Sequence, residues 1–353
     1  MQVSVALARS LCQAVFADKL GCPSQVAEVA VEALVEANLR GIDSHGIQVL
    51  PYYLQKWSAG QLVADAELEV VHESPATVLF DAHHGVGHYV SHCVMESAIS
   101  RASDLGIAAA VVRNSTHNGA LSNYTIQAAR RGMIGIAGTA CAPHVAPYGG
   151  TAGLHGTNPI SYALPRGASD PFVFDCSTGH SAAKMKAHAE REGILPADRL
   201  IDAQGRPTTD PGDLKKGWIL PVAGHIGYGL GLLVDGLTCA LAGSPIGRQL
   251  PLAHDTSGPY YGSFFALAIS PEAFSGFAAF TGQINELSSQ IESHQPQDPD
   301  HPVRWPGQRG WEVRQRRLHQ GIPVADPQWE TLIDELNAYG VAVDRPGLPA
   351  NGD

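Results

Sequence analysis

The chain has 353 residues, a hydrophobic fraction of 44%, a charged fraction of 16% and a formal net charge of −11. This length and apolar content are enough for a large buried core, and they exclude a disordered chain. The 23 basic residues are scattered among 34 acidic ones, so no nucleic-acid partner is expected. The six cysteines form no Cys-x-x-Cys pair, which predicts reduced thiols in a cytoplasmic protein.

The N-terminal part is predicted to form helices followed by two short strands. Apolar side chains recur at helical spacing over 3–20 and 25–40, and a third amphipathic stretch ends near Gly60. The first helix contains charged residues and lacks a small-residue cleavage site, so we expect an amphipathic helix and not a signal peptide. Runs at 69–72 and 77–80, bounded by polar residues, are typical of strands.

Helices and strands alternate in the rest of the chain, which predicts a mixed α/β sheet. The expected elements are, in chain order, a helix at 86–104, a strand at 107–112, a helix at 120–131, strands at 133–139, 159–163 and 172–174, a surface loop at 196–214, a strand at 263–270, and helices at 275–293, 311–320 and 327–339. The apolar run 226–243 is rich in glycine and interrupted by Asp235. We expect it to be a buried core helix and not a membrane span.

A sheet of this kind raises the question of dinucleotide binding. The Rossmann fingerprint, Gly-x-Gly-x-x-Gly after a first strand with an acidic residue about 20 positions later, is absent. The nearest match, Gly227-Tyr228-Gly229-Leu230-Gly231, lies inside the apolar run and follows no strand, which indicates close helix packing. If the protein binds such a cofactor, it does so on another scaffold.

Three histidines follow one another at a spacing of four residues: His84, His88 and His92. On a continuous helix they share one face, as ligands of Zn²⁺ or Cu²⁺ would. The alternative is a helix whose histidines cap, pack or face water. We favour this alternative, because no distant acidic or cysteine partner accompanies the run, and predict no metal site.

Two other histidines are candidates for proton transfer. His45 lies in the turn Asp43-Ser44-His45-Gly46, and His117 lies just past the end of the strand at 107–112. Open α/β sheets place their sites at such strand ends. A neutral imidazole with a pKa near 6.5 can donate and accept a proton at neutral pH, as carbonyl reduction requires. Either residue is also compatible with a structural role.

These two motifs and the segments after them resemble the malate/L-lactate dehydrogenase family, a group without the Rossmann fold that includes ureidoglycolate and sulfolactate dehydrogenases. The resemblance extends over about residues 3–340. The matching motifs are residues 40–46, 115–120, 145–150, 156–159, 174–175, 205–211, 227–230 and 306–308. The stretch 305–323 looks most like the hydroxycarboxylate dehydrogenase branch.

The resemblance implies an α/β fold like that of L-sulfolactate dehydrogenase, with a mixed, mainly antiparallel sheet flanked by helices. It implies one interwoven catalytic unit over 1–342, with a helical part at 1–65 and 306–342, a cofactor-binding part at about 106–290, and a tail at 343–353. It also implies a homodimer in which NAD or NADP, with NAD favoured, lies in a cleft completed by the partner subunit.

On this resemblance, His117 is the general acid/base, and His45 with Ser44 before it completes the active site. The cofactor contacts fall on Cys141, Asp175, Cys176, Ser177, Ile226, Pro306, Gly307 and Gln308. The nicotinamide would exchange a hydride with the substrate carbonyl carbon while the imidazole gives or takes the proton. The predicted reaction interconverts a 2-hydroxy acid and a 2-oxo acid.

Three departures from the family pattern bear on this prediction. Ile226 stands where a cofactor-contacting lysine is expected, and losing a charge-assisted hydrogen bond costs about 1.5–3 kcal/mol. Val49 stands where many members carry the arginine that holds the substrate carboxylate, which favours a bulky or aromatic substrate. Lys184 and Lys186 flank the position of a family lysine. These changes leave open an alternative, a binding or structural dimer that has lost turnover.

Overall fold

The computed structural model describes residues 1–252 and 255–342. Within these residues, seven strands form one central sheet in the order β2-β3-β4-β10-β5-β6-β7. The strands are β2 (Glu69–Glu73), β3 (Thr77–Asp81), β4 (Ile107–Ser115), β10 (Gly262–Ile269), β5 (Ile134–Ala140), β6 (Ile160–Arg166) and β7 (Ser169–Cys176). β3 and β4 are parallel, and the other neighbouring pairs of this sheet are antiparallel. The predicted mixed, mainly antiparallel sheet is confirmed.

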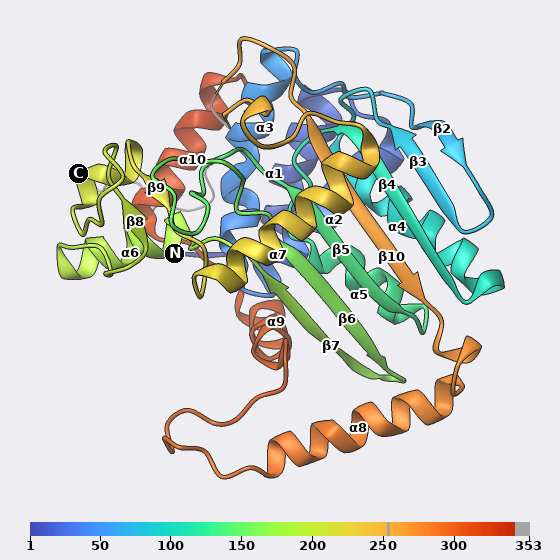
Figure 1. Ribbon diagram of the computed structural model, residues 1–353. Helices are drawn as coiled ribbons and strands as arrows, with labels where there is room; N and C mark the ends of the chain where they lie inside the picture. The colour runs from blue at the N-terminus through green and yellow to red at the C-terminus, as the bar shows by residue number, and fades with distance from the viewer. Residues whose placement is uncertain (253–254, 343–353) are drawn as a thin grey trace, which may run out of the picture.

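Helices cover both faces of this sheet (Figure 1). α4 (Gly87–Leu105) and α5 (Ser122–Arg130) pack on one face, where they bury Met95 and Tyr124 against Phe264 of β10. α7 (His225–Asp235) crosses the other face and continues as a π-helical turn over Gly236–Ala240. The two central strands, β4 and β10, are mostly buried and rich in alanine, which lets the helices approach closely.

The two ends of the chain pack together in a helical part beside the sheet. Its elements are β1 (Gln2–Val3), α1 (Val5–Gln13) with a π-helical continuation (Ala14–Lys19), α2 (Ser24–Leu39), α3 (Leu50–Ser58), β11 (Ile322–Pro323) and α10 (Asp326–Ala338). β1 pairs with β11, so the first and last strands of the described residues are hydrogen-bonded. Phe16, Leu34, Tyr53 and Leu336 are buried in one shared core. The expected N-terminal and C-terminal helices are therefore present.

A small lobe after β7 differs from the prediction. It contains α6 (Ala182–Glu192), which the sequence pattern did not reveal, and the paired strands β8 (Leu200–Ile201) and β9 (Trp218–Ile219). The stretch 196–214, expected to be a surface loop, thus includes a strand and a 3₁₀ turn at Pro211–Lys215. α6 has a single buried side chain among its described residues, so it carries no apolar stripe to signal a helix.

α8 (Phe277–Ser293) and α9 (Gln308–Gln320) agree with the prediction to within a few residues. α8 lies along the end of the sheet formed by β6 and β7, as the orange helix in Figure 1 shows. α9 returns the chain to α2 in the helical part. α9 begins three residues before the expected position, because Gly307 at its N-cap takes the left-handed conformation and turns the chain.

The apolar run 226–243 is not a buried core helix, contrary to the prediction. α7 contacts Gly138 of β5 through Val234, and its buried Gly227 and Gly231 lie against Thr178 in the turn after β7. Ile226 is 56% exposed and Leu233 is 49% exposed on other sides of the helix. The prediction was wrong because α7 is apolar all round, and only its glycine-containing side has a partner within the described residues.

None of the helices within residues 1–252 and 255–342 combines the length and the apolar character needed to cross a membrane. The predicted tail at 343–353 lies outside the described residues. The division of 1–342 into a helical part and a cofactor-binding part stays a prediction.

Candidate active site

Three strands bring predicted site residues to the same end of the sheet. β10 runs antiparallel to both β4 and β5, and its first residues pair with the last residues of both strands. β7 ends at Cys176 opposite the first residue of β6, and β6 starts beside the end of β5. His117, Cys141 and the turn after Asp175 therefore follow strand ends at the same end of the sheet, with β10 between β4 and β5 and β6 between β5 and β7.

His117 follows β4 in a loop that the start of α4 holds in place. The Gly87 N–H donates to the hydroxyl of Thr116 (2.8 Å), which donates to the carbonyl oxygen of Gly85 (2.8 Å). A Cβ at Gly87 would lie 2.4 Å from the His117 carbonyl oxygen, so glycine is required there. The His117 side chain is partly exposed, and its Nδ1 lies 2.7 Å from the hydroxyl oxygen of Tyr53 in α3.

His45 stacks on His117. The ring centroids are 5.6 Å apart and the ring planes differ by 18°. His45 ends the 3₁₀ turn Asp43–His45, and the Ser44 hydroxyl lies 2.9 Å from its Nδ1. Arg317 of α9 anchors this turn, since its Nη1 and Nη2 donate to the two carboxylate oxygens of Asp43 (2.6 and 3.0 Å). The structure thus brings His117, His45 and Ser44 together from separate segments.

Burial favours the neutral form of both imidazoles. It lowers the pKa of His117 well below its usual range, and the nearby His45 and His88 lower that pKa further. Burial also lowers the pKa of His45, and the negative charge of Asp175 opposes this shift. A neutral His117 can take a proton from an alcohol without first losing one. The site therefore suits a general base at neutral pH.

Tyrosines that the sequence analysis did not single out line the same site. The Tyr52 ring stands edge-on to the His117 ring at a centroid distance of 5.6 Å, and burial raises the pKa of Tyr52 to about 12. The ammonium of Lys56 lies 5.5 Å from the ring centre of Tyr52 and 5.3 Å from that of Tyr260. Val49 is partly buried against the core of the helical part. Aromatic residues in an amphipathic stretch look like core residues, so no signal marked these tyrosines.

The predicted cofactor residues before α9 lie against β7. The Val173 N–H donates to the carbonyl oxygen of Pro306 (2.8 Å). Gly307 has a φ of +92°, and a Cβ there would lie 2.8 Å from the carbonyl oxygen of Val173. Both observations require glycine at this position. Gln308 begins α9, and its side-chain oxygen accepts a hydrogen bond from the Trp305 N–H (3.2 Å).

The end of β7 contributes three further predicted cofactor residues. Asp175 is exposed, and its Oδ2 accepts a hydrogen bond from the Ser122 N–H at the start of α5 (2.8 Å). This helix N-terminus favours the negative charge of the carboxylate. Cys176 is partly buried, and the Ser177 hydroxyl donates to the carbonyl oxygen of Gly179 (2.6 Å). The turn after β7 is therefore fixed by its own hydrogen bonds.

Cys141 and Ile226 complete the predicted cofactor set. The Cys141 N–H donates to Oδ1 of Asn158 (3.0 Å), and burial raises the pKa of the Cys141 thiol. A Cβ at Gly227 would lie 2.5 Å from the carbonyl oxygen of Thr178, so α7 starts close to the turn after β7. Ile226 is exposed at this helix start. The eight predicted cofactor positions thus lie around the ends of β5 and β7.

The lysines that flank the family position lie elsewhere. Lys184 and Lys186 are exposed on α6, and Met185 between them is buried in the core of the small lobe. Lys186 lies 3.9 Å from the carboxylate of Glu190, one helical turn along α6. Neither lysine therefore occupies the buried side of its helix.

The three histidines of the possible metal motif do not share one helical face. His84 has a φ of +64° and precedes α4, which begins at Gly87. Its Nδ1 lies 3.0 Å from the carbonyl oxygen of Tyr260, whereas His88 is buried beside Tyr53. Within the part of the chain that the structure describes, no group of three or more metal-binding side chains has the arrangement of a metal site.

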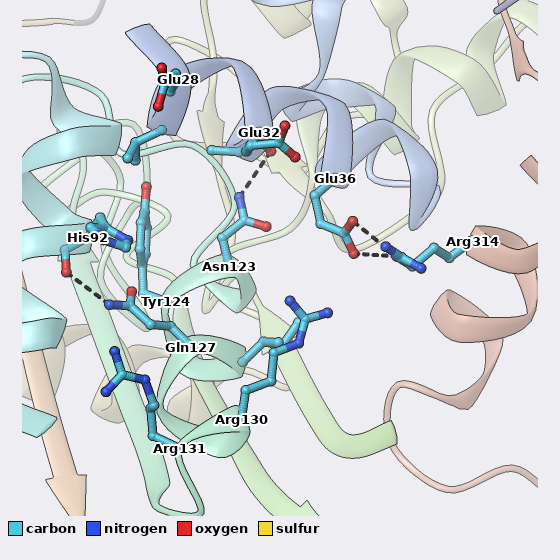
Figure 2. A pocket seen from close by; sticks show the side chains of 13 residues that line it. Glu28, Glu32, Glu36, His92, Asn123, Tyr124, Gln127, Arg130, Arg131 and Arg314 are labelled. Atoms are coloured by element: carbon cyan, nitrogen blue, oxygen red, sulfur yellow. Dashed lines mark hydrogen bonds and ion pairs between the residues drawn. The ribbon is translucent and has the colours of Figure 1, made fainter. Parts of the chain in front are cut away.

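A cavity of about 580 Å³ lies between α2, α4, α5 and α9 (Figure 2). Its walls carry glutamate and arginine side chains. Figure 2 shows Glu36 of α2 paired with Arg314 of α9, whose Nε lies 2.8 and 3.0 Å from the two carboxylate oxygens. None of the predicted catalytic or cofactor residues lines this cavity. It is separate from the candidate active site.

Comparisons with known proteins identify the family of this chain and agree with its fold. The family model described as malate/L-lactate dehydrogenase matches residues 3–333. The chain belongs to this family. It is an oxidoreductase of the dehydrogenase type, as the names of its relatives indicate. The fold expected from the sequence resemblance is therefore confirmed.

Individual relatives and one solved structure cover nearly the whole chain. L-sulfolactate dehydrogenase of Methanocaldococcus jannaschii is 34% identical over 92% of this chain and 94% of its own. Ureidoglycolate dehydrogenase (NAD(+)) of Escherichia coli O157:H7 is 32% identical over 92% and 91%. (2R)-3-sulfolactate dehydrogenase (NADP(+)) of Chromohalobacter salexigens is 33% identical over 92% and 94%. A structure of a sulfolactate dehydrogenase from M. jannaschii superposes with a TM-score of 0.88 and 30% identity, over 96% of this chain and 98% of that one.

Proposed function

We propose that the protein interconverts a 2-hydroxy acid and a 2-oxo acid with a nicotinamide cofactor, and that His117 is the general acid/base. The placement of His117 carries this proposal. Its Nδ1 lies 2.7 Å from the Tyr53 hydroxyl, and it follows β4 at the end of the sheet where β5 and β7 also end. The relatives named as dehydrogenases of sulfolactate and ureidoglycolate support the reaction class. They give no support to the alternative of a dimer without turnover.

The residues present fit a nicotinamide dinucleotide. α7 and α9 both begin near the end of β7, and the N-terminal ends of two helices favour the negative charge of a diphosphate. Gly307 leaves the backbone there without a side chain. The residues that would hold the cofactor are Cys141, Asp175, Cys176, Ser177, Ile226, Pro306, Gly307 and Gln308. NAD is favoured over NADP, although relatives named for each exist.

The proton chemistry follows from how His117 is held. When bound, the nicotinamide supplies or accepts the hydride at the substrate carbon. Nε2 of His117 takes the hydroxyl proton during oxidation and returns it to the oxygen during reduction. The Tyr53 hydroxyl is hydrogen-bonded to Nδ1 of His117, so Nε2 of His117 is the ring nitrogen that remains for the substrate. The stacked ring of His45 restricts the rotation of His117.

The side chains around His117 favour a substrate with a bulky or aromatic side chain. Val49 supplies no cation for a substrate carboxylate, and the Tyr52 ring gives the site an apolar wall. The exposed hydroxyl of Ser44 is available to a substrate carboxylate. A monocarboxylic 2-oxo acid with an apolar tail therefore fits better than a dicarboxylic one.

We further propose a homodimer in a cytoplasmic environment. Apolar side chains at helical spacing along α7 and its continuation are 39–59% exposed; they are Ile226, Leu230, Leu233 and Leu241. A stripe of this kind is typical of a protein–protein interface. Because it starts at a predicted cofactor position, a partner subunit on this stripe would border the cofactor. The six cysteines, all within the described residues, are free thiols, which supports a reducing compartment.

Oxidation of NADH and NADPH against a panel of 2-oxo acids tests the proposed reaction. The panel includes pyruvate, oxaloacetate, phenylpyruvate and its hydroxylated form, and one cyclic imine. We expect turnover by the wild type and a loss of about 100-fold or more in His117→Ala, because the proton donor is removed. His72→Ala, an exposed histidine on β2, serves as the matched control and should keep the wild-type rate. Equal rates for His117→Ala and the wild type would contradict the proposal.

A further inference from the structure

The hydroxyl of Tyr53 contacts two imidazoles. It lies 2.7 Å from Nδ1 of His117 and 3.3 Å from Nε2 of His88. Tyr53 on α3 is 1% exposed, and His88 in the first turn of α4 is 0% exposed. A Cβ at Gly119 would lie 2.6 Å from the His88 Nε2, so glycine at 119 makes room for this ring. The three side chains form a continuous hydrogen-bonded chain from the core to the site.

The hydrogen bonds among His88, Tyr53 and His117 can be oriented in only a few ways. The tyrosine hydroxyl carries one proton, so it can donate to one imidazole and accept from the other. His117 binds and releases a proton at Nε2 in each turnover, so its Nδ1 keeps a proton throughout and needs an acceptor. The Tyr53 oxygen is that acceptor, which directs the hydroxyl proton of Tyr53 toward His88. A single orientation then serves both directions of the reaction.

We propose that His88 is a positioning residue that acts through the Tyr53 hydroxyl to fix the Nδ1–H tautomer of His117. The inference rests on the proposed role of His117 and deepens it. His88 accepts the proton of Tyr53 at Nε2, so the Tyr53 oxygen stays available to His117. His88 touches neither substrate nor cofactor in this arrangement. It resembles the residue that orients the histidine of a catalytic triad, with a neutral imidazole in place of a carboxylate.

The surroundings of His88 support this role. Its Nδ1 has no hydrogen-bond partner among the described residues. An unpartnered polar atom in the core destabilises the fold, so a purely structural position would favour an apolar side chain. The Phe16 ring stands at 87° to the His88 ring at a centroid distance of 6.2 Å, an arrangement in which an N–H can face a π system. Burial lowers the pKa of His88 to about 3, so the ring stays neutral.

The tautomer of His117 tests the proposal without any turnover. Long-range ¹H–¹⁵N spectra of protein labelled at histidine nitrogens distinguish the Nδ1–H and Nε2–H forms. We expect the Nδ1–H form of His117 in the wild type and in His88→Gln, whose amide can reach the position of Nε2. We expect His88→Leu to lose this preference. An unchanged Nδ1–H form in His88→Leu would overturn the proposal, whether or not the enzyme turns over any acid of the panel.

Steady-state kinetics distinguish a positioning role of His88 from a purely structural role. His88→Leu should lower kcat about 10- to 100-fold in both directions while KM changes less than about twofold, as for other residues that orient a functional histidine. It should also displace the pH profile of kcat. His88→Gln should restore most of the activity. If His88→Leu does not fold, His88→Asn replaces it, because its shorter amide leaves Tyr53 without an acceptor.

A double-mutant cycle shows whether His88 acts through Tyr53. Tyr53→Phe and the double variant Tyr53→Phe/His88→Leu should have the same kcat, because the hydroxyl that His88 orients is already gone. Independent, multiplying losses would overturn the proposal. A wild type that oxidises neither NADH nor NADPH with any acid would remove the proposed function, and the tautomer measurement would still decide the role of His88.

Discussion

Ile226 is the predicted cofactor residue that stands where a family lysine is expected. It lies at the start of α7, beside the turn after β7, and 56% of its side chain is exposed. An aliphatic group at this place neither donates a hydrogen bond nor balances the charge of a phosphate. On the proposed placement of the cofactor, binding would depend on the main chain and on the N-terminal ends of α7 and α9, which supply only partial charges.

Ile226→Lys should tighten NADH binding about 10- to 100-fold, because it restores one charge-assisted hydrogen bond. The dissociation constant is measured by fluorescence titration of NADH. Leu230→Lys adds the same charge one turn along α7 and is the control, with an expected constant close to that of the wild type. An unchanged constant in Ile226→Lys would contradict the placement of the cofactor at this helix start.

Single residues were predictable from sequence where they sit in loop motifs. His117 follows a strand and precedes a glycine-bearing turn, and His45 lies between helices beside Gly46, so both were identified. Tyr53 and His88 were not assigned these roles. Their side chains lie on helices at positions that bury apolar residues, and periodicity cannot distinguish a buried functional ring from a buried packing ring.

Helices and strands were predictable from the sequence where one face of the element is buried. β4 and β10 were found because their apolar runs end at turn residues, and α8 and α10 because they are amphipathic. α6 was missed because only Met185 among its residues is buried. The exposed side of α7 was not foreseen, since hydropathy alone does not say whether an apolar surface meets the same chain or a second one.

The stripe along α7 gives a prediction about assembly. Leu233→Glu places a charge in the middle of the stripe and should convert a dimer into a monomer at micromolar concentration, because burying an unpaired carboxylate opposes association. Leu105→Glu on α4 is the matched control, since Leu105 is 48% exposed and Leu233 is 49% exposed. Sedimentation equilibrium measures the mass. A wild type that sediments as a monomer, or a Leu233→Glu variant that remains a dimer, would rule out this interface.

The chain as a whole keeps several fully or partly buried histidines neutral. Burial lowers the pKa of His88 to about 3, and it lowers the pKa of His117 well below the usual range. The pKa of His180 is lowered to about 4 by burial and by the charge of Arg199. In the unfolded chain these side chains bind a proton near pH 6.5, so the unfolded state gains protons first as the pH falls.

The contribution of these neutral histidines to the free energy of unfolding is fully present above pH 6.5. It is lost progressively as the pH falls toward 3. His88 alone should cost about 2 kcal/mol of unfolding free energy between pH 7 and pH 5. Urea unfolding at the two pH values measures this change. His88→Leu lacks the titrating group and should show a smaller difference between pH 7 and pH 5. Equal stability of the wild type at both pH values would be inconsistent with neutral buried histidines.

The transfer of deuterium from a reduced cofactor labelled at C4 tests the central claim most directly. The wild type is incubated with NADH that carries deuterium at both C4 positions and with the acid of the panel that it reduces fastest, and the product is analysed by mass spectrometry. The account predicts one deuterium on C2 of the 2-hydroxy acid, formed by the wild type and formed about 100-fold or more slowly by His117→Ala. A product without deuterium, or equal labelling by His117→Ala at the wild-type rate, would contradict it.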